Sequence, residues 1–436
     1  MADHGHRIDP EACIGCIACA KVCPTKAIRV RNDVAGVISE LCIDCGACVR
    51  ACQYNAALPA TSPPSDLKKF KYTVALPSLT LYGQFGKDVD PDQVLRALTE
   101  IGFDRTYDIS WMCEMIAAAT DAYLTECKGP WPKISATCPA IVRLIQIRYP
   151  ALIDNIIPLE TPRELSAKLL RRKLSAQLGL APEEIGLFFI TPCTAIMNSI
   201  LNPVGLEQSY LDGALSIRDV YSPLFRATQQ RRPAEIGDGF SPRGLLWAMA
   251  GGEISGMRSA NTLTVRGVPD VEYVFYHIEA GKFQSVDFIE AYICPDGCVS
   301  GGLTVEGRYA AQRNIQEIAK RLSRKAESLA PGRVQEEKVR SLLREHFFDL
   351  EEEINARPIQ PLAADLRRAI ALKREQAAIL QQLPRKDCAA CGAPDCVTLA
   401  EDIVRGEAAL DDCVFIKIQR LEQQLHPRKD GQDEQA

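Results

Sequence analysis

The sequence predicts a multidomain α/β protein with a cysteine-rich module at the N-terminus and a helical region with a second cysteine-rich module at the C-terminus. Three observations carry this prediction. A cysteine run is duplicated within residues 1–58. Strand-like and helix-like stretches then alternate, which is typical of a largely parallel sheet. After Gly302 the chain becomes charged and amphipathic, as in packed surface helices.

The N-terminal module is defined by two cysteine runs in the same register. The first reads C-x2-C-x2-C-x3-C-P, and adding 29 to each residue number gives the second run, which ends in Gln53 where the first has a proline. Runs of this type wrap two cubanes, and the fourth cysteine of each run ligates the other cluster. Disulfides and zinc are the alternatives, but a zinc site needs only four ligands. We therefore assign one 4Fe–4S cluster to Cys13, Cys16, Cys19 and Cys52, and the other to Cys42, Cys45, Cys48 and Cys23.

The bulk composition is that of an ordinary globular protein, with 436 residues, 47% apolar and 25% charged. A length of this order predicts about three domains. The net charge of −5 argues against a nucleic-acid binder, and no apolar run is long enough for a membrane span. The polar start predicts no signal peptide. Many cysteines without an export signal predict metal ligation in a reducing compartment, so we expect a cytoplasmic protein of an anaerobic cell.

The α/β domain is expected over residues 71–310, after a Pro/Ser-rich linker at residues 59–70. Hydrophobic patterning predicts helices over Pro91–Ile101 and Arg163–Leu178. The predicted strands are Tyr72–Leu76, Ile185–Thr191, Val271–Phe275 and Phe288–Ile293.

The C-terminal region divides into a helical segment at residues 311–383, a module at 384–420 and a polar tail at 421–436. The expected helices are Gln312–Leu322, Glu336–Ile354, Leu362–Leu383 and Val397–Ala409. The module reads C-x2-C-G-x3-C-x16-C and resembles a small accessory 4Fe–4S module of anaerobic redox complexes. Four thiolates also suit zinc, but the other clusters favour iron–sulfur. Its predicted ligands are Cys388, Cys391, Cys396 and Cys413.

Four scattered cysteines lie in contexts that resemble the cofactor motifs of the iron-only (FeFe) hydrogenases. The contexts are TCPA at 137–140, TPC at 191–193 and EAYICPDGC at 290–298, and the GG-x-TVE segment at 301–306 is most similar to the sensory branch. The resemblance implies two α/β lobes with a cubane in the cleft between them, and the last cysteine at a position that bridges to a diiron subcluster. It assigns the cubane to Cys138, Cys193, Cys294 and Cys298, and a close backbone approach to the cofactor to Gly297, Gly301 and Gly302.

The departures from that family fall on the diiron half of its cofactor. A lysine that donates to a cyanide ligand is Ile196 here, and no Lys or Arg occurs between Cys193 and Arg218. A glutamate is replaced by Ser199, and the proton-delivering cysteine by Thr137, whose hydroxyl shuttles protons poorly. Two methionines are replaced by Thr191 and Tyr292. These changes spare the cubane and argue against the diiron subcluster.

The resulting hypothesis is a multi-cluster electron-transfer protein of the FeFe-hydrogenase superfamily, with four 4Fe–4S clusters and a redox partner such as ferredoxin, flavodoxin or a larger oxidoreductase. A divergent hydrogenase and a redox sensor are the alternatives, so enzymatic activity stays open. The remaining Cys113 and Cys127 are expected to be core or half-buried thiols. We expect Glu114 to lie on a solvated helix face, although it falls near the hydrogenase-like proton entry.

Overall fold

The computed structural model describes residues 4–229, 240–259, 261–326, 334–357 and 359–425. The first residues of the tail predicted at 421–436 belong to a helix that ends at Leu425, and the rest of the tail lies outside the described residues. The chain forms two compact units. Unit 1 comprises Met1–Arg7, Ile43–Gly46 and Pro59–Arg357, and unit 2 comprises Ile8–Cys42, Ala47–Leu58 and Pro358–Ala436. Each unit is described by itself.

Unit 1 contains two parallel sheets, each with its own hydrophobic core. The first has the strand order β6-β5-β8-β9 and the second the order β10-β11-β7. All the ladders in both sheets are parallel, as expected for an α/β domain. The strands are β5 (Tyr72–Pro77), β6 (Arg105–Thr106), β7 (Lys133–Ile134), β8 (Ile185–Thr191), β9 (Gly213–Ser216), β10 (Thr262–Arg266) and β11 (Phe288–Tyr292).

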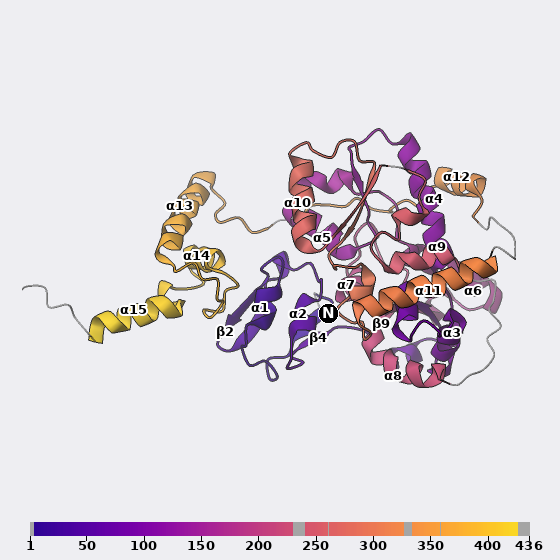
Figure 1. Cartoon of the computed structure of the whole chain (residues 1–436), viewed down its shortest axis with the longest axis horizontal. Coiled ribbons are helices and arrows are strands. Elements are labelled where there is room, and N and C mark those ends of the chain that lie inside the picture. The colour runs from indigo at the N-terminus through magenta and orange to yellow at the C-terminus, as the bar shows by residue number, and fades with distance from the viewer. Residues whose placement is uncertain (1–3, 230–239, 260, 327–333, 358, 426–436) are drawn as a thin grey trace, which may run out of the picture. The chain divides into compact units, whose positions relative to one another are not determined.

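Helices cover these sheets, and Figure 1 shows α5 and α10 beside the strands of the second one. The helices before the first gap in the described residues are α3 (Pro91–Glu100), α4 (Ser110–Glu126), α5 (Pro139–Arg148), α6 (Pro162–Leu178), α7 (Thr194–Leu201) and α8 (Ile217–Thr228). Those that follow are α9 (Pro242–Leu245), α10 (Val268–Glu279), α11 (Arg308–Ala326) and α12 (Glu336–Arg344). The mixed α/β class predicted from the alternating pattern is confirmed.

One predicted strand is wrong. Val271–Phe275 lies inside α10, although its valines and aromatic residues favour a strand. The buried residues of this helix are Val271, Val274, Phe275 and Ile278, which is the three-and-four spacing of a helix face. The strand that pairs with β11 is β10, a TLTVR segment that the sequence reading missed.

Three predicted helices are shorter than expected. The one predicted over Val397–Ala409 ends at Val404, and local features limit the other two. The helix predicted over Glu336–Ile354 ends at Arg344, and the chain then takes a left-handed turn at His346. The helix predicted from Leu362 begins at Leu366, because the Asp365 carboxylate caps it by accepting from the Arg368 N–H at 2.9 Å. Caps and left-handed residues, which periodicity does not reveal, therefore set both limits.

Unit 2 contains the paired helices and hairpin of a ferredoxin-like module together with the C-terminal helices. Strand β1 (His6–Ile8) pairs with β4 (Ala57–Pro59), and β2 (Ile28–Arg31) forms an antiparallel hairpin with β3 (Val34–Val37). The helices are α1 (Ala18–Val22), α2 (Ala47–Ala51), α13 (Leu366–Gln382), α14 (Cys396–Val404) and α15 (Val414–Leu425). Among the described residues, no helix has both the length and the apolar character needed to cross a membrane.

Candidate metal centres

The four central cysteines of unit 1 lie where strands of its two sheets end. Cys138 follows β7 and caps the N-terminus of α5, and Cys193 follows β8 and caps α7. Cys294 and Cys298 follow β11. The carboxyl ends of parallel strands are the usual ligand edge of an α/β sheet, and helix N-termini stabilise anions such as thiolates. The fold therefore aims two helix dipoles at this set.

The central thiols are buried and influence one another electrostatically. Burial raises the pKa of the Cys298 thiol well above its usual value, and the neighbouring Cys193, Cys138 and Cys294 raise it further. Burial likewise raises the pKa of Cys193 to about 11, although the backbone N–H groups of Ile196 and Ala195 act in the opposite direction. Thiolates at this site must therefore be formed by metal binding itself, which releases the protons.

The spacing of the sulfurs suits clusters better than single zinc ions. A tetrahedral zinc ion with Zn–S bonds of about 2.3 Å holds its thiolates about 3.8 Å apart. Within the described part of the chain, which contains every cysteine, no three sulfurs lie within 4.8 Å of one another. A cubane separates its ligands more widely because four irons and four sulfides lie between them. This spacing is therefore wider than a single zinc ion requires, and ligation of cubanes stays a prediction.

The glycines of the third motif have packing roles that the structure makes explicit. Gly297 has a φ of +79°, and a Cβ there would lie 2.4 Å from the Ala250 N atom. A Cβ on Gly301 would lie 2.4 Å from the Pro192 carbonyl oxygen. Gly302 is less crowded, with 3.1 Å to the Gly46 carbonyl oxygen. Contact of these glycines with a cofactor stays a prediction, but close backbone packing next to Cys298 already requires two of them.

A buried arginine that the sequence reading missed lies beside this cysteine set. Arg163 of α6 is 8% exposed, and its guanidinium donates to the Ser199 hydroxyl at 3.3 Å and the Thr137 carbonyl at 3.5 Å. Its charge opposes the rise in pKa of the thiols of Cys138 and Cys298. The sequence between Cys193 and Arg218 carries no Lys or Arg, but α6 supplies this cation from an earlier part of the chain. Only the tertiary fold brings Arg163 here, so no local motif could have indicated it.

Two of the residues that depart from the hydrogenase pattern, Ser199 and Thr191, donate hydrogen bonds to backbone carbonyls nearby. Ile196 is buried in the core of the first sheet. The Ser199 hydroxyl donates to the Ile196 carbonyl at 2.8 Å, and the Thr191 hydroxyl donates to the Cys193 carbonyl at 2.9 Å. Tyr292 is 2% exposed. These side chains complete the protein interior around the cysteines.

A small polar cavity lies behind Arg163. Its volume of about 40 Å³ has room for a few water molecules, and Glu160, Glu164, Arg143 and Ser199 contribute to its lining. Burial raises the pKa of Glu164 to about 7, although the Arg163 charge lowers it. The Glu164 carboxylate accepts from the Ser209 hydroxyl at 2.8 Å. A water-sized polar space with an acid that titrates near neutrality can store a proton next to the cysteine set.

A pair of buried acids lies at the second sheet, the one that contains β11. Glu290 is fully buried in β11 and accepts from the Gly251 N–H at 2.9 Å and the Glu253 N–H at 3.2 Å. Glu253 accepts from the Ser135 hydroxyl at 2.8 Å. Burial, and then the charge of Glu290, raises the pKa of Glu253, and burial also raises that of Glu290. Two adjacent buried carboxylates hold a proton because both cannot ionise cheaply.

The predicted ligand set of the first N-terminal cluster lines one cavity. Cys13, Cys16, Cys19 and Cys52 all contribute to its wall, together with Val30 and Ala35. The backbone N–H groups of Ala35 and Ala56 point at sulfur, donating to Cys13 at 3.4 Å and to Cys52 at 3.3 Å. The spacing predicted that Cys52, from the second run, joins the first three cysteines of the first run. The structure places Cys52 on the same cavity as those three cysteines. Metal ligation itself stays a prediction.

The second N-terminal set is divided between the units. Cys23, Cys42 and Cys48 belong to unit 2, whereas Cys45 lies on the loop Ile43–Gly46, which belongs to unit 1. Within unit 1, Cys45 packs against the same hydrophobic core as Cys138 and Cys193. The convergence of the four thiols on one cluster stays a prediction.

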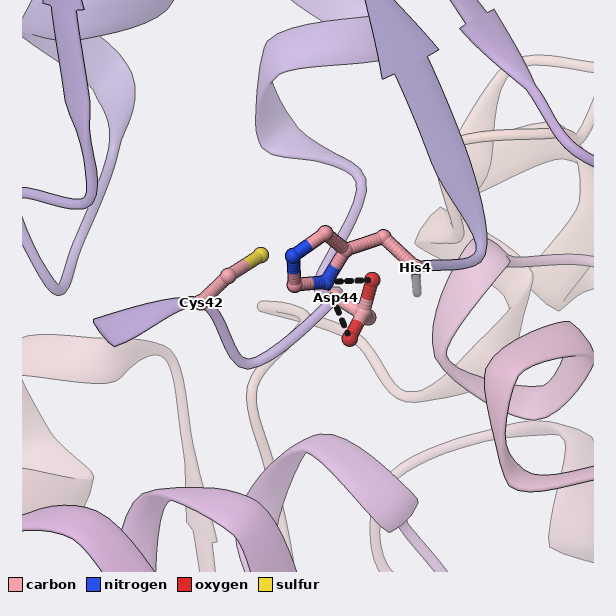
Figure 2. Close-up of side chains that lie close together, drawn as sticks. All are labelled: His4, Cys42 and Asp44. Carbon is pink, nitrogen blue, oxygen red and sulfur yellow. Dashed lines mark hydrogen bonds and ion pairs between the residues drawn. The ribbon is translucent and has the colours of Figure 1, made fainter. Parts of the chain in front are cut away.

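The loop that carries Cys45 is fixed by a buried aspartate. Asp44 is 0% exposed and lies 3.2 Å from the Arg143 guanidinium and 3.0 Å from the Gly5 N–H, which donates to it. Figure 2 shows the imidazole of His4 directed at the same carboxylate, at 3.3 Å. Burial alone would raise the pKa of Asp44, but His4, His6 and Arg143 hold it well below its usual value. This ionic centre was not predicted, because Asp44 stands inside a cysteine motif.

The C-terminal cysteines also share one small core. Cys396 begins α14 and Cys413 immediately precedes α15, and both pack with Leu399 and Ala400. Cys391 borders this core, and burial, followed by the charges of Cys413 and Cys388, raises its pKa. Ala400, which lies between the third and fourth cysteines of the module, thus fills the space under the predicted cluster.

The unassigned residues have ordinary surroundings. Cys113 is 2% exposed in the core of the first sheet, and Cys127 is half-buried at the end of α4. Both are the thiols that the sequence predicted. Glu114 is also half-buried, and it accepts a hydrogen bond from the Ser241 hydroxyl instead of facing open solvent.

Comparison with protein families defines the class of each part of the chain. Residues 71–230 match the iron-only hydrogenase large subunit, C-terminal domain. Residues 6–53 match a 4Fe–4S dicluster domain, and residues 383–415 match a family described by its Fe–S cluster. The chain therefore combines a hydrogenase-like α/β domain with an N-terminal dicluster domain and a C-terminal Fe–S domain. The third central motif, with Cys294 and Cys298, lies beyond the first match.

Individual relatives are mostly hydrogenases. Iron hydrogenase 1 of Clostridium pasteurianum is 23% identical over 265 residues, or 50% of this chain and 46% of that protein. This chain thus spans about half the length of that relative. The large subunit of the periplasmic [Fe] hydrogenase of Nitratidesulfovibrio vulgaris is 24% identical over 364 residues, or 69% of this chain and 86% of that one. The cytosolic Fe-S cluster assembly factor NAR1 of Neosartorya fischeri is 29% identical over 100 residues, or 21% of this chain and 17% of that factor.

Solved structures share the fold. The FeFe hydrogenase HydA(deltaEFG), whose structure reveals stepwise H-cluster assembly, superimposes with a TM-score of 0.51 at 15% identity, covering 68% of this chain and 97% of that one. An apo variant of the HydA1 hydrogenase from Chlamydomonas reinhardtii gives a TM-score of 0.51 at 15% identity, over 69% of this chain and 98% of that one. Identities this low establish the fold alone.

Proposed function

We propose that this chain relays electrons through four 4Fe–4S clusters and has no working diiron centre. The observation that carries the proposal is the coordinated replacement at Ile196, Ser199 and Thr137, beside an intact set of four central cysteines. A buried anionic diatomic ligand needs a charged or hydrogen-bonding partner. The apolar Ile196 side chain, buried in the core, offers none. The residues present fit a cubane and do not fit the diiron group.

The protein groups around each cluster have distinct tasks in such a relay. A cubane accepts and releases one electron, and its potential follows local charge, burial and hydrogen bonds to sulfur. Arg163 and the N-termini of α5 and α7 offset the negative charge of the central site. The Ala35 and Ala56 N–H groups act similarly on Cys13 and Cys52. Within unit 1, Cys45 packs on the core that also contacts Cys138 and Cys193.

The similarity to NAR1 also supports a role without hydrogen turnover. That relative is a cluster assembly factor by name, and it shares 100 aligned residues with this chain. A sequence similar to part of this chain therefore occurs in a protein named for another task.

A divergent hydrogenase is the second candidate, and Arg163 is the observation that favours it. Its guanidinium reaches Ser199, one helical turn beyond Ile196, where it adds a positive charge that α7 itself lacks. The relay proposal assigns this charge to the cubane thiolates. The hydrogenase alternative assigns it to a cyanide ligand.

Co-expression with hydrogenase maturation proteins separates the two candidates. The relay proposal predicts about sixteen irons per chain, reversible reduction of the clusters, no carbonyl or cyanide bands in the infrared and no hydrogen evolution with reduced viologen. Diatomic-ligand bands together with turnover would overturn the proposal and establish the hydrogenase. The Arg163→Gln variant is the matched control, because any bands that depend on this residue identify it as the partner of a cyanide ligand.

A further inference from the structure

We propose that the C-terminal cluster module is fixed on the N-terminal dicluster domain, and that its cluster exchanges electrons with the cluster of Cys13, Cys16, Cys19 and Cys52 through Val30. The inference rests on the proposed relay function and states which two clusters are neighbours in the relay. In each step one electron leaves a reduced cubane and reduces the neighbouring oxidised one. No bond breaks and no proton moves, and a low-potential one-electron donor protein supplies the electron.

The contact between the two modules, both in unit 2, centres on one buried carboxylate. Asp402 of α14 is 1% exposed and forms a two-pronged ion pair with Arg29 of β2, with distances of 2.6 and 2.9 Å. Arg31, two residues further along β2, donates to the same carboxylate at 2.9 Å. A buried carboxylate is stable only with such partners, so the two modules depend on each other at this point. A loose tether would not bury a charge in this way.

Backbone contacts bring the cysteine loop itself against the edge of β2. The Val30 N–H donates to the Gly392 carbonyl at 2.9 Å, and Arg31 donates to the Cys391 carbonyl at 2.8 Å. An edge strand has free N–H groups that recruit another chain segment in this manner. A Cβ on Gly392 would lie only 1.8 Å from the Val30 carbonyl oxygen, so only glycine permits the approach. The glycine of the C-x2-C-G motif thus has a role at this contact.

A second ion pair lies at the other end of the contact. Lys26 is 2.5 Å from Asp395, and Asp395 caps α14 by accepting from the Thr398 N–H at 2.8 Å. Asp395 directly precedes Cys396, and Lys26 follows Cys23 by three residues. Predicted ligands of both modules therefore flank the same contact.

Val30 connects the contact to the first N-terminal cluster. Val30 lines the cavity walled by Cys13, Cys16, Cys19 and Cys52, and its N–H donates to the Gly392 carbonyl. A single residue thus spans the protein between this cavity and the loop of Cys391. Electron tunnelling decays steeply with distance and is favoured by hydrogen-bonded paths, so this is the exit that the C-terminal cluster would use.

The test is electron paramagnetic resonance of the full chain with all clusters reconstituted and reduced. Two reduced clusters with a single residue between them interact magnetically. We therefore expect broadened or split signals from the C-terminal and first N-terminal clusters. Asp402→Asn should abolish the interaction and slow reduction of one cluster by the other at least tenfold, with iron content unchanged. Glu401→Gln, the neighbouring residue of α14 with a more exposed ion pair to Arg405, is the matched control and should retain both properties.

A second variant is needed in case Asp402→Asn loses the C-terminal cluster. Arg29→Gln changes the other side of the contact and leaves the C-terminal module intact. Unbroadened signals in the unaltered protein, or full interaction in both variants, would overturn the proposal. The outcome is independent of the diiron question. Diatomic-ligand bands with hydrogen turnover would overturn the relay function but not the contact between the modules. Absence of the magnetic interaction would overturn the contact but not the relay function.

Discussion

The N-terminal and central cysteine sets hold the same kind of predicted cluster in opposite ways. Cys13 and Cys16 lie on one short loop and Cys19 in α1, which directly follows it, and backbone N–H groups such as that of Ala35 complete the site. Cys138 and Cys298 come from different parts of a two-sheet domain and depend on helix ends and on Arg163 from a third element. The first arrangement is a property of local sequence, and the second is a property of the fold. The central site should therefore be more sensitive to remote changes.

The largest expected effect distinguishes the sets by loss of one cluster. Cys193→Ala removes a ligand that caps α7, and we expect about four of about sixteen irons to disappear while the N-terminal signals persist. Anaerobic iron and sulfide assays with paramagnetic resonance measure this. Cys113→Ala is the control, because Cys113 is a buried thiol of the same unit that belongs to no predicted ligand set. Retention of all the irons in Cys193→Ala would remove Cys193 from the central site.

A smaller effect is expected when the remote charge is removed. Arg163→Gln should lower the reduction potential of the central cluster, because reduction adds negative charge that the guanidinium offsets. A unit charge about 8–16 Å away at an effective dielectric constant of about 20 contributes about 1–2 kcal/mol, or about 50–90 mV for a one-electron couple. Redox titration followed by paramagnetic resonance measures the shift.

Two comparisons make the Arg163 prediction specific. Arg163→Lys keeps the charge and should restore most of the potential, which a purely structural role of the guanidinium would not allow. The N-terminal potentials should stay unchanged in both variants. An unaltered central potential in Arg163→Gln would show that this site, like the N-terminal one, is tuned locally.

The smallest effect on the clusters themselves is expected from a buried acid, which instead changes the dependence of stability on pH. Burial raises the pKa of Glu164 from 4.5 to about 7, against the lowering effect of Arg163. Between these values the folded protein holds a proton that the unfolded chain has released, so stability falls as the pH rises from about 4.5 to 7 and then levels off. This contribution amounts to about 3 kcal/mol at most. Glu164→Gln should flatten that part of the curve of unfolding free energy against pH, whereas Glu126→Gln, at an exposed position, should not. A slope identical to that of the unaltered protein would exclude Glu164 as its source.

The sequence predicted what depends on local pattern. Strand β8 was predicted at its full extent, Ile185–Thr191, because a buried run of β-branched and aromatic residues leaves little choice. The same preference misled at Val271–Phe275, where packing of one helix face overrode it. Cysteine spacing and motif context predicted every candidate ligand. Arg163, Glu164 and Asp44 could not be predicted, because their roles arise from contacts between residues far apart in the chain.

The buried pair of Asp44 and Arg143 has a consequence for how such a protein can evolve. Domains that follow one another along a sequence are often treated as parts that lineages gain, lose or exchange freely. Here a residue inside the dicluster motif neutralises an arginine of helix α5 that is only 6% exposed. Loss of the N-terminal module would leave that guanidinium buried without its counter-ion, at a cost of about 3–5 kcal/mol. We therefore expect a lineage that discards the module to change Arg143 as well.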